Sequence, residues 1–392
     1  MQLALTIFSK NKFPAPKKYW LATLFFLLTA CNTPTIPPAI TPTPAFTLSK
    51  WANLPDWSSQ NLSASHRAFL QSCRVLKSRP TWQAVCAGAE PLDINNNPAL
   101  RAFYEMWFTP YQVFNPDGTE HGIITGYYEP MLLGSRAPTP RFRYPLYAVP
   151  SDILTVDLSA TYPQLKDMRL RGRVQGNRIM PYYTRAEIEA GAGAVKGREL
   201  FWVENPVELF FLHIQGSGRI DLPDGTQVKV GYADQNGHPY MSIGKKLVDM
   251  GELKLEEASM QSIKLWGEKN PEKLGALLSH NPSYVFFREL PDNTTTPPGA
   301  LGVPLTNEYS IAIDPRIIPL GAPVFLSTTY PNDSAPLNRL MLAQDTGGAI
   351  RGAVRADFFW GAGKEAGTQA GKMKQPGRLW VLFPKGGEPA LN

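Results

Sequence analysis

The stretch between residues 123 and 220 constrains the fold most, because proline, glycine and asparagine interrupt its apolar runs every few residues. From "IITGYYEPMLLG" to "ELFFLHIQGSGRI", short apolar runs alternate with these turn residues. Such a pattern is typical of β-strands and predicts a compact barrel or sandwich. Within it, "TRAEIEAG" predicts one short helix, with Thr184 at the N-cap facing Glu187 and Gly191 at its end.

Helical patterns cluster outside this middle stretch, and strand patterns return from Gly302 onward. The 392 residues exceed the usual size of one domain, so we expect one large core or two smaller ones. We therefore predict a mainly β fold in which helices flank one barrel and a second β module lies between them. The expected helices are "SHRAFLQSCRVLKS", "PALRAFYEMWF", "SIGKKLVDMG", "SMQSIKLWGEKN" and "EKLGALLSHN", and the later strands are "YSIAIDP", "APVFLST", "RLMLAQD" and "GRLWVLFP".

The first 31 residues resemble an export signal, with lysines followed by the apolar core "YWLATLFFLLTA". This core is shorter than the roughly 20 apolar residues that a membrane-spanning helix needs. Its end, Leu28-Thr29-Ala30-Cys31, resembles a bacterial lipobox, and Asn32 resembles an outer-membrane address. We expect a lipoprotein anchored through Cys31 in the outer membrane and facing the periplasm. An ordinary cleaved signal and an uncleaved anchor are the alternatives.

The proline-rich residues 32–49 predict an extended tether. The formal net charge is +6, but lysine and arginine are scattered, which argues against nucleic acid as a partner. The basic balance suits an acidic polymer or simply a solvated surface. Once Cys31 is lipidated, Cys73 and Cys86 remain, and these two can form a disulfide in an oxidising compartment or stay two buried thiols.

Several kinds of catalytic chemistry have no signal in this sequence. None of the five histidines has metal-ligand spacing such as HExxH, and no CxxC pair, GxSxG elbow or Walker loop is present. We therefore expect neither a metal nor an organic cofactor. The remaining chemistry is that of carboxylates acting on a saccharide. Aromatic and amide side chains near turns favour this interpretation, among them Tyr127, Tyr128, Gln215, Asn236, Tyr240 and Trp360.

Two aspartates in "AQDTGGAIRGAVRADFFWG" are the candidates for that chemistry. Asp357 precedes three aromatic residues, and an apolar setting would raise the pKa of its carboxyl as a general acid requires. Asp345 precedes a glycine turn, where backbone N–H groups would keep it ionised. Asp314, before a proline, is typical of the start of a turn. For each single aspartate, a cap or Asx-turn is the alternative interpretation.

Taken in order, nine motifs resemble the membrane-bound lytic murein transglycosylase A family, over about residues 49–384. The C-terminal part resembles the family's 3D domain, which is named for three aspartates that correspond here to Asp314, Asp345 and Asp357. The motifs are "GYYEP", "HIQGSG", "GHPYMSIGKKL", "SYVFFREL", "GALGVPLT", "SIAIDPRIIPLG", "AQDTGGAIRG", "RADFFWGAG" and "AGKMKQPGRLWVL".

This resemblance implies a double-psi β-barrel formed by residues 50–125 and 232–392, with its 3D part at about 302–384. A smaller β domain, residues 126–231, would be inserted, and a glycan groove would lie between the two domains. The implied reaction cleaves the β-1,4 bond between N-acetylmuramic acid and N-acetylglucosamine and leaves a 1,6-anhydro sugar, without a cofactor.

The resemblance also implies roles for single residues. Asp357 would act as general acid and then as base, and Asp345 and Asp314 would support it. The partners would be peptidoglycan glycan strands, the membrane at the lipid anchor and other cell-wall enzymes in a complex. The expected substrate-binding residues are Tyr127, Tyr128, Gln215, Gly216, Ser217, Thr306, Trp360 and Glu365.

Two other functions stay open at this point, because a fold does not determine a function. A glycan hydrolase would need a second carboxylate, such as Asp345, to activate water or to act as nucleophile. A wall-binding lipoprotein without activity would need the groove aromatics and not Asp357.

Overall fold

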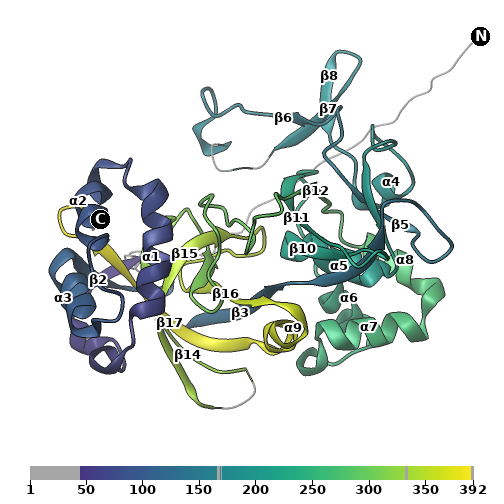
Figure 1. Ribbon diagram of the computed structural model, residues 1–392. Helices are drawn as coiled ribbons and strands as arrows, with labels where there is room; N and C mark the ends of the chain where they lie inside the picture. The colour runs from purple at the N-terminus through teal and green to yellow at the C-terminus, as the bar shows by residue number, and fades with distance from the viewer. Residues whose placement is uncertain (1–44, 166–167, 169, 332–333, 390–392) are drawn as a thin grey trace, which may run out of the picture. The chain divides into compact units, whose positions relative to one another are not determined.

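Six strands close into a β-barrel within the part of the chain that the structure describes (Figure 1). The structure is a computed structural model that describes residues 45–165, 168, 170–331 and 334–389. The ring runs β17–β14–β15–β13–β16–β3 and returns to β17, and β2 and then β1 extend the sheet beyond β17. These strands are β1 (Phe46–Leu48), β2 (Phe108–Val113), β3 (Gly122–Glu129), β13 (Ser310–Ile313), β14 (Pro323–Thr329), β15 (Pro336–Thr346), β16 (Arg355–Ala362) and β17 (Lys374–Pro384).

Strand β17 closes the barrel because it is long enough to pair with several neighbours. Residues 374–377 pair with β3, and residues 378–381 pair with β14. Residues 380–384 pair with β2. Closure leaves no open edge among the six ring strands, and the inward-facing side chains fill the interior. Ile124, Phe358 and Ala343 belong to this buried apolar core.

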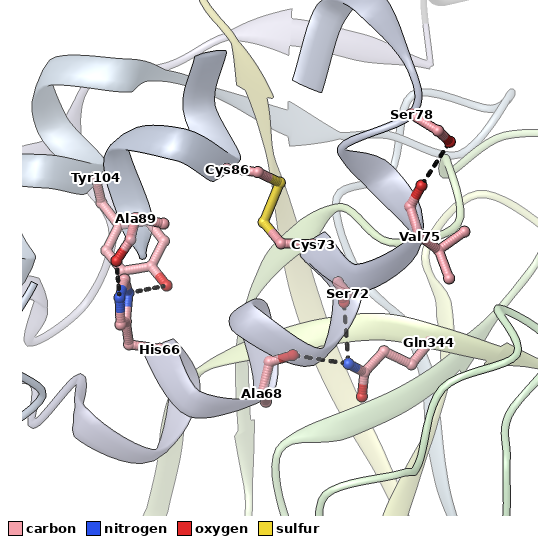
Figure 2. The surroundings of a disulfide bond; sticks show 10 residues. All are labelled: His66, Ala68, Ser72, Cys73, Val75, Ser78, Cys86, Ala89, Tyr104 and Gln344. Carbon is pink, nitrogen blue, oxygen red and sulfur yellow. Dashed lines mark hydrogen bonds between the residues drawn. A yellow bond between two sulfur atoms is a disulfide. The ribbon is translucent and has the colours of Figure 1, made fainter. Parts of the chain in front are cut away.

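Three helices cover one side of the barrel: α1 (Ser63–Leu76), α2 (Pro80–Ala89) and α3 (Asn97–Trp107). The Cys73–Cys86 disulfide joins α1 to α2, with Cα atoms 5.5 Å apart (Figure 2). Figure 2 also shows how α1 holds β15, since the buried Gln344 side-chain amide donates to Ala68 O at 2.8 Å and Ser72 Oγ at 2.9 Å. Helix α1 therefore anchors β15 at the residue before Asp345.

A second, six-stranded sheet lies between β3 and β13 in the sequence, with the order β12–β11–β10–β4–β9–β5. Pro130 joins the barrel strand β3 directly to β4, so one extended segment serves both sheets. A separate three-stranded sheet consists of β6 (Leu154–Thr155), β7 (Arg171–Gln175) and β8 (Arg178–Pro181). The six strands are β4 (Met131–Ser135), β5 (Tyr144–Tyr147), β9 (Glu199–Val203), β10 (Ser217–Asp221), β11 (Gln227–Gln235) and β12 (Val285–Glu289).

Helix α5 contacts β5, β10 and β12 of this second sheet, and α6, α7 and α8 share an apolar cluster with α5. Helix α9 instead contacts β3 and β16 of the barrel. Helix α4 has the predicted capping box, in which Thr184 and Glu187 bond each other's backbone N–H groups. These helices are α4 (Arg185–Glu189), α5 (Pro206–Gln215), α6 (Ile243–Asp249), α7 (Met260–Lys269), α8 (Pro271–Ser279) and α9 (Gly363–Lys372).

The predicted fold class is confirmed: the chain is mainly β, with a closed barrel, a smaller β domain inserted into it and flanking helices. Two local predictions were wrong. The run "ELFFLHIQ" was expected as a strand and lies in α5, where the Asn205 side chain accepts from two N–H groups, Pro206 begins the helix and Gly216 ends it at φ 79°. Helix α9 forms where only strands were expected, and its Ala366, Gly367 and Ala370 are buried on the side that contacts β3 and β16 of the barrel.

Most of the predicted N-terminal features lie outside the described residues. These are the export signal at residues 1–31, the lipidation site Cys31 and the tether as far as residue 44. The last part of the predicted tether, Phe46–Leu48, forms β1 and pairs with β2. Among the residues that the structure does describe, no helix is both long and apolar enough to span a membrane.

The disulfide generates a prediction about stability. Replacing both cysteines, as Cys73→Ala with Cys86→Ala, should lower the free energy of unfolding by about 2–4 kcal/mol, because the bond restricts the unfolded chain. Urea unfolding followed by tryptophan fluorescence measures this change. As a control, a reductant should lower the midpoint of the wild-type protein and leave that of the double variant unchanged. Equal midpoints for wild type and double variant would contradict the prediction.

Candidate active site

Strand register places two of the three aspartates in one row on the barrel. Ala312 on β13 pairs with Asp345 on β15 and with Asp357 on β16. Asp357 in turn pairs with Thr125 on β3. Because directly paired residues point to the same face of a sheet, these four side chains lie side by side across four strands.

This row lies on the opposite face of the sheet from the main barrel core. Along β16, Ala356, Phe358 and Trp360 alternate with Asp357 and belong to that core. Phe359 shares the face of Asp357 and packs in a separate small cluster with Tyr127, Leu305, Ala312 and Ile350. The aspartates are therefore partly covered by loop residues and are not enclosed in the barrel.

Asp357 is held by a hydrogen bond from the neighbouring strand. Thr125 Oγ1 donates to Asp357 Oδ1 at 2.5 Å, and Arg355 Nη2 donates to Thr125 Oγ1 at 2.8 Å. Burial raises the pKa of Asp357 above its ordinary value, and the Arg355 charge and the Thr125 hydrogen bond partly oppose that rise. A carboxyl in this setting is suited to hold a proton that it can deliver.

Asp345 accepts more hydrogen bonds than Asp357 does. Its Oδ1 accepts from the backbone N–H groups of Ala300 and Thr346, both at 2.9 Å, and its Oδ2 accepts from the Tyr127 hydroxyl at 3.0 Å. These are the backbone bonds expected for Asp345. However, burial outweighs them, and the Asp357 charge adds to burial, so the pKa of Asp345 is also raised. The expected contrast between the pKa values of the two aspartates is thus not observed.

Asp314 is fully buried and serves a different purpose. Its carboxylate pairs with the Arg316 side chain through contacts of 2.8 and 2.5 Å and accepts from Gly352 N at 3.0 Å. Burial alone would raise the pKa of Asp314, but these hydrogen bonds and the Arg316 charge outweigh it and lower the pKa to about 2. Asp314 therefore joins the turn after β13 to the loop before β16.

Tyr127 and Tyr128 point to opposite faces of β3, as neighbours in a strand must. Tyr127 reaches Asp345, whereas Tyr128 lines a cavity of about 360 Å³ on the other face together with Gly126 and Gln215. Gln215 Oε1 also accepts from the Tyr128 backbone N–H at 2.9 Å. Gly216 ends α5 and Ser217 begins β10, so neither of these residues joins the row of aspartates.

The other predicted substrate-binding residues are spread over different surroundings. Trp360 is only 9% exposed, and its indole N–H donates to Met373 Sδ at 3.3 Å in the barrel core. Glu365 is exposed on α9. The Thr306 backbone N–H donates to Ser310 Oγ at 2.7 Å in the loop that leads into β13. The structure therefore brings Tyr127 to the aspartates, leaves Tyr128, Gln215 and Glu365 on other surfaces, and buries Trp360 in the barrel core.

Thr125 and Arg355, the two residues that hold Asp357, were not predicted from the sequence. Arg355 lies two residues before Asp357 and hence on the same face of β16, which the sequence could have indicated. The pairing of Thr125 with Asp357 joins residues 232 apart in the chain, and nothing in either segment alone indicates it. Within the described residues, no group of three or more histidine, cysteine, aspartate or glutamate side chains is arranged to hold a metal ion.

These features define a class of site: carboxyl groups arranged for acid–base chemistry on the outer face of a closed barrel. Known proteins are similar to this chain in both sequence and structure. Residues 123–288 match the "MltA specific insert domain", and residues 309–383 match the "3D domain".

Among relatives, the membrane-bound lytic murein transglycosylase A of Escherichia coli (strain K12) is 37% identical over 279 residues, covering 69% of this chain and 68% of that protein. The crystal structure of MltA from Neisseria gonorrhoeae is 43% identical, with a TM-score of 0.75, and covers 90% of this chain and 98% of its own. Escherichia coli MltA with bound chitohexaose has a TM-score of 0.62 at 30% identity, covering 88% and 92%. This chain belongs to the membrane-bound lytic murein transglycosylase A family.

Asp314 generates a prediction about pH and stability. Because its pKa is about 2 in the folded protein and near 3.8 ordinarily, its stabilisation is complete above about pH 4 and is lost as the pH falls through about 2. The free energy of unfolding of the wild type, measured in urea, should therefore fall by about 2 kcal/mol over this range. The Asp314→Asn variant should not show this fall. Parallel pH dependences for the two proteins would refute this role of Asp314.

Proposed function

We propose that this chain is a lytic transglycosylase that cleaves the β-1,4 bond between N-acetylmuramic acid and N-acetylglucosamine in peptidoglycan. Its family membership supports this proposal, because the relatives are lytic murein transglycosylases. The solved complex of the Escherichia coli protein with chitohexaose supports a glycan as the ligand. The choice of reaction depends on how the two neighbouring aspartates are engaged.

The observation that carries the proposal is the difference in hydrogen bonding between Asp345 and Asp357. Both oxygens of Asp345 accept hydrogen bonds, three in all, so little capacity is left to activate a water or to attack a sugar. Asp357 accepts one side-chain hydrogen bond, at Oδ1. One carboxyl is therefore available for proton transfer, whereas a hydrolase of the usual kind needs two.

One carboxyl is sufficient for a transglycosylase. Asp357, whose pKa is raised by burial, acts in its protonated form and donates that proton to the leaving glycosidic oxygen. The resulting carboxylate accepts the proton of the muramic-acid 6-hydroxyl as that oxygen bonds to C1 of the same sugar. The product is a 1,6-anhydro ring, and no water is consumed. Because the nucleophile belongs to the substrate, attack is intramolecular and correspondingly fast.

The remaining roles follow from this assignment. Asp345 orders the loop at Ala300 and holds the Tyr127 hydroxyl beside the reacting site, and Asp314 orders the loop before β16. We assign the glycan groove to the face that carries Asp357, between the barrel and the inserted domain, whose sequence boundaries of 126–231 remain a prediction. Thr306 and Tyr127 are the predicted substrate-binding residues that best fit this face.

For the cellular context, we propose a lipid anchor at Cys31 and a place at the outer membrane facing the periplasm. The relatives are named as membrane-bound, and their organisms include Escherichia coli and Vibrio cholerae. The Cys73–Cys86 disulfide supports an exported protein, since such bonds persist in oxidising compartments. The partners would be the glycan strands and other enzymes of the cell wall.

The products of murein digestion test the proposal. The full chain, purified in detergent, should release muropeptides that are one water lighter than hydrolytic products when they are weighed by mass spectrometry. Asp357→Asn should lower the rate by about 10²–10⁴-fold, because an amide cannot deliver the proton. Asp117→Asn, a change at an exposed loop aspartate, is the matched control and should keep the wild-type rate.

Other results would select a different function. Products with a reducing end, together with equal losses in Asp345→Asn and Asp357→Asn, would indicate a two-carboxylate hydrolase. Wall binding without any release of muropeptides would indicate a binding protein. Full activity in Asp357→Asn would refute the assignment of the acid.

A further inference from the structure

We infer that Thr125 is a positioning residue, which together with Arg355 commits Oδ1 of Asp357 to a hydrogen bond and leaves Oδ2 as the atom that exchanges protons with the substrate. This inference rests on the proposed function and adds to it the identity of the reacting oxygen and of the residues that select it.

The direction of the hydrogen bonds follows from the donors available. A guanidinium can only donate, so Thr125 Oγ1 must accept from Arg355 Nη2 at 2.8 Å. A threonine hydroxyl has a single hydrogen. With its oxygen accepting from Arg355, that hydrogen is directed to Asp357 Oδ1 at 2.5 Å. Oδ1 is therefore an acceptor whether or not the carboxyl is protonated, and the acidic proton must reside on Oδ2.

Arg355 is held in place independently of Thr125. Its Nη1 donates to the backbone oxygens of Ala356 at 2.5 Å and Ile123 at 3.3 Å. The guanidinium thus joins β16 to β3 at the point where Thr125 and Asp357 are paired. Among the residues described here, none donates a hydrogen bond to Asp357 Oδ2. That oxygen is left for the glycosidic oxygen and then for the 6-hydroxyl proton.

The groups that affect the charge of Asp357 lie on three strands, β16, β3 and β15. Arg355 lies on the same strand, β16, and Thr125 and Tyr127 lie on β3. Asp345 lies on β15, and its interaction with Asp357 disfavours two negative charges. The paired residue on β13 is Ala312, which has no charge. Of these, Thr125 and Arg355 favour the carboxylate form of Asp357.

Removing the Thr125 hydroxyl should therefore change the pH dependence as well as the rate. A hydrogen bond to a carboxylate lowers its pKa, so its loss raises the pKa of Asp357. The reaction begins with a protonated Asp357, and its rate falls as the pH rises through that pKa. In Thr125→Val, this fall should occur at higher pH than in the wild type, by about one unit.

The experiment measures the initial rate of murein solubilisation against pH, at substrate concentrations below saturation, for the full chain and its variants. Thr125→Val keeps the shape and suits a strand, and it should lose at least about tenfold in rate at the optimum, with the alkaline fall displaced upward. Thr125→Ser keeps the hydroxyl and should retain the wild-type pH profile. Arg355→Met removes the charge that opposes protonation of Asp357, so the alkaline fall in its rate should also move to higher pH.

Three results would overturn the inference: a wild-type rate and profile in Thr125→Val, a lower rate with an unmoved profile, or a Thr125→Ser variant as impaired as Thr125→Val. Thermal unfolding by circular dichroism separates these results from loss of fold, and Arg355→Met supplies a second test if Thr125→Val is unstable. Full activity in Asp357→Asn would overturn the proposed function itself. An inactive Asp357→Asn combined with an unmoved Thr125→Val profile would overturn only the role of Thr125.

Discussion

The pairing of β17 with both β14 and β3 is the constraint on which the rest of the structure depends. Without that closure, β3 would pair only with β16 and would be the edge of an open sheet. Because β3 continues through Pro130 into β4, the same strand fixes where the inserted domain begins. Strand β3 therefore contributes both to closing the barrel and to placing the start of the second β domain, and it also carries Thr125 and Tyr127 of the site.

The site is a consequence of strand register. A shift of β16 by one residue against β13 and β3 would exchange Asp357 for Ala356 or Phe358 and turn the carboxyl into the core. The buried Gln344 helps to prevent such a shift in β15, because its amide is bound by α1 and it accepts from Ser310 on β13. A buried polar residue thus helps to specify the register that places Asp345 in the row with Asp357.

Much of the fold could be predicted from the sequence, but the exceptions are informative. Apolar spacing identified α1 and α3, and apolar runs between turns identified β13, β14, β15 and β17, because both signals are local. Strand β16, which carries Asp357, was not among the predicted strands. Helix α5 was taken for a strand since Leu209, Phe210 and Leu212 are buried on several sides and leave no amphipathic period. In the site, the motifs identified the aspartates and Tyr127, but they predicted wrongly that Asp345 would differ from Asp357 in the direction of its pKa change.

By itself, the sequence determined the features that neighbouring residues encode: the β-rich architecture, the capping box of α4, the family motifs and the acidic residues within them. Only the tertiary structure decided what Asp357 can do. The alternation of a strand defines two faces but does not say which face is buried, and Trp360 lies in the core for that reason while Asp357 does not. The partner that orients Asp357 is Thr125, 232 residues away, and a contact so distant in the chain exists only after the barrel has closed.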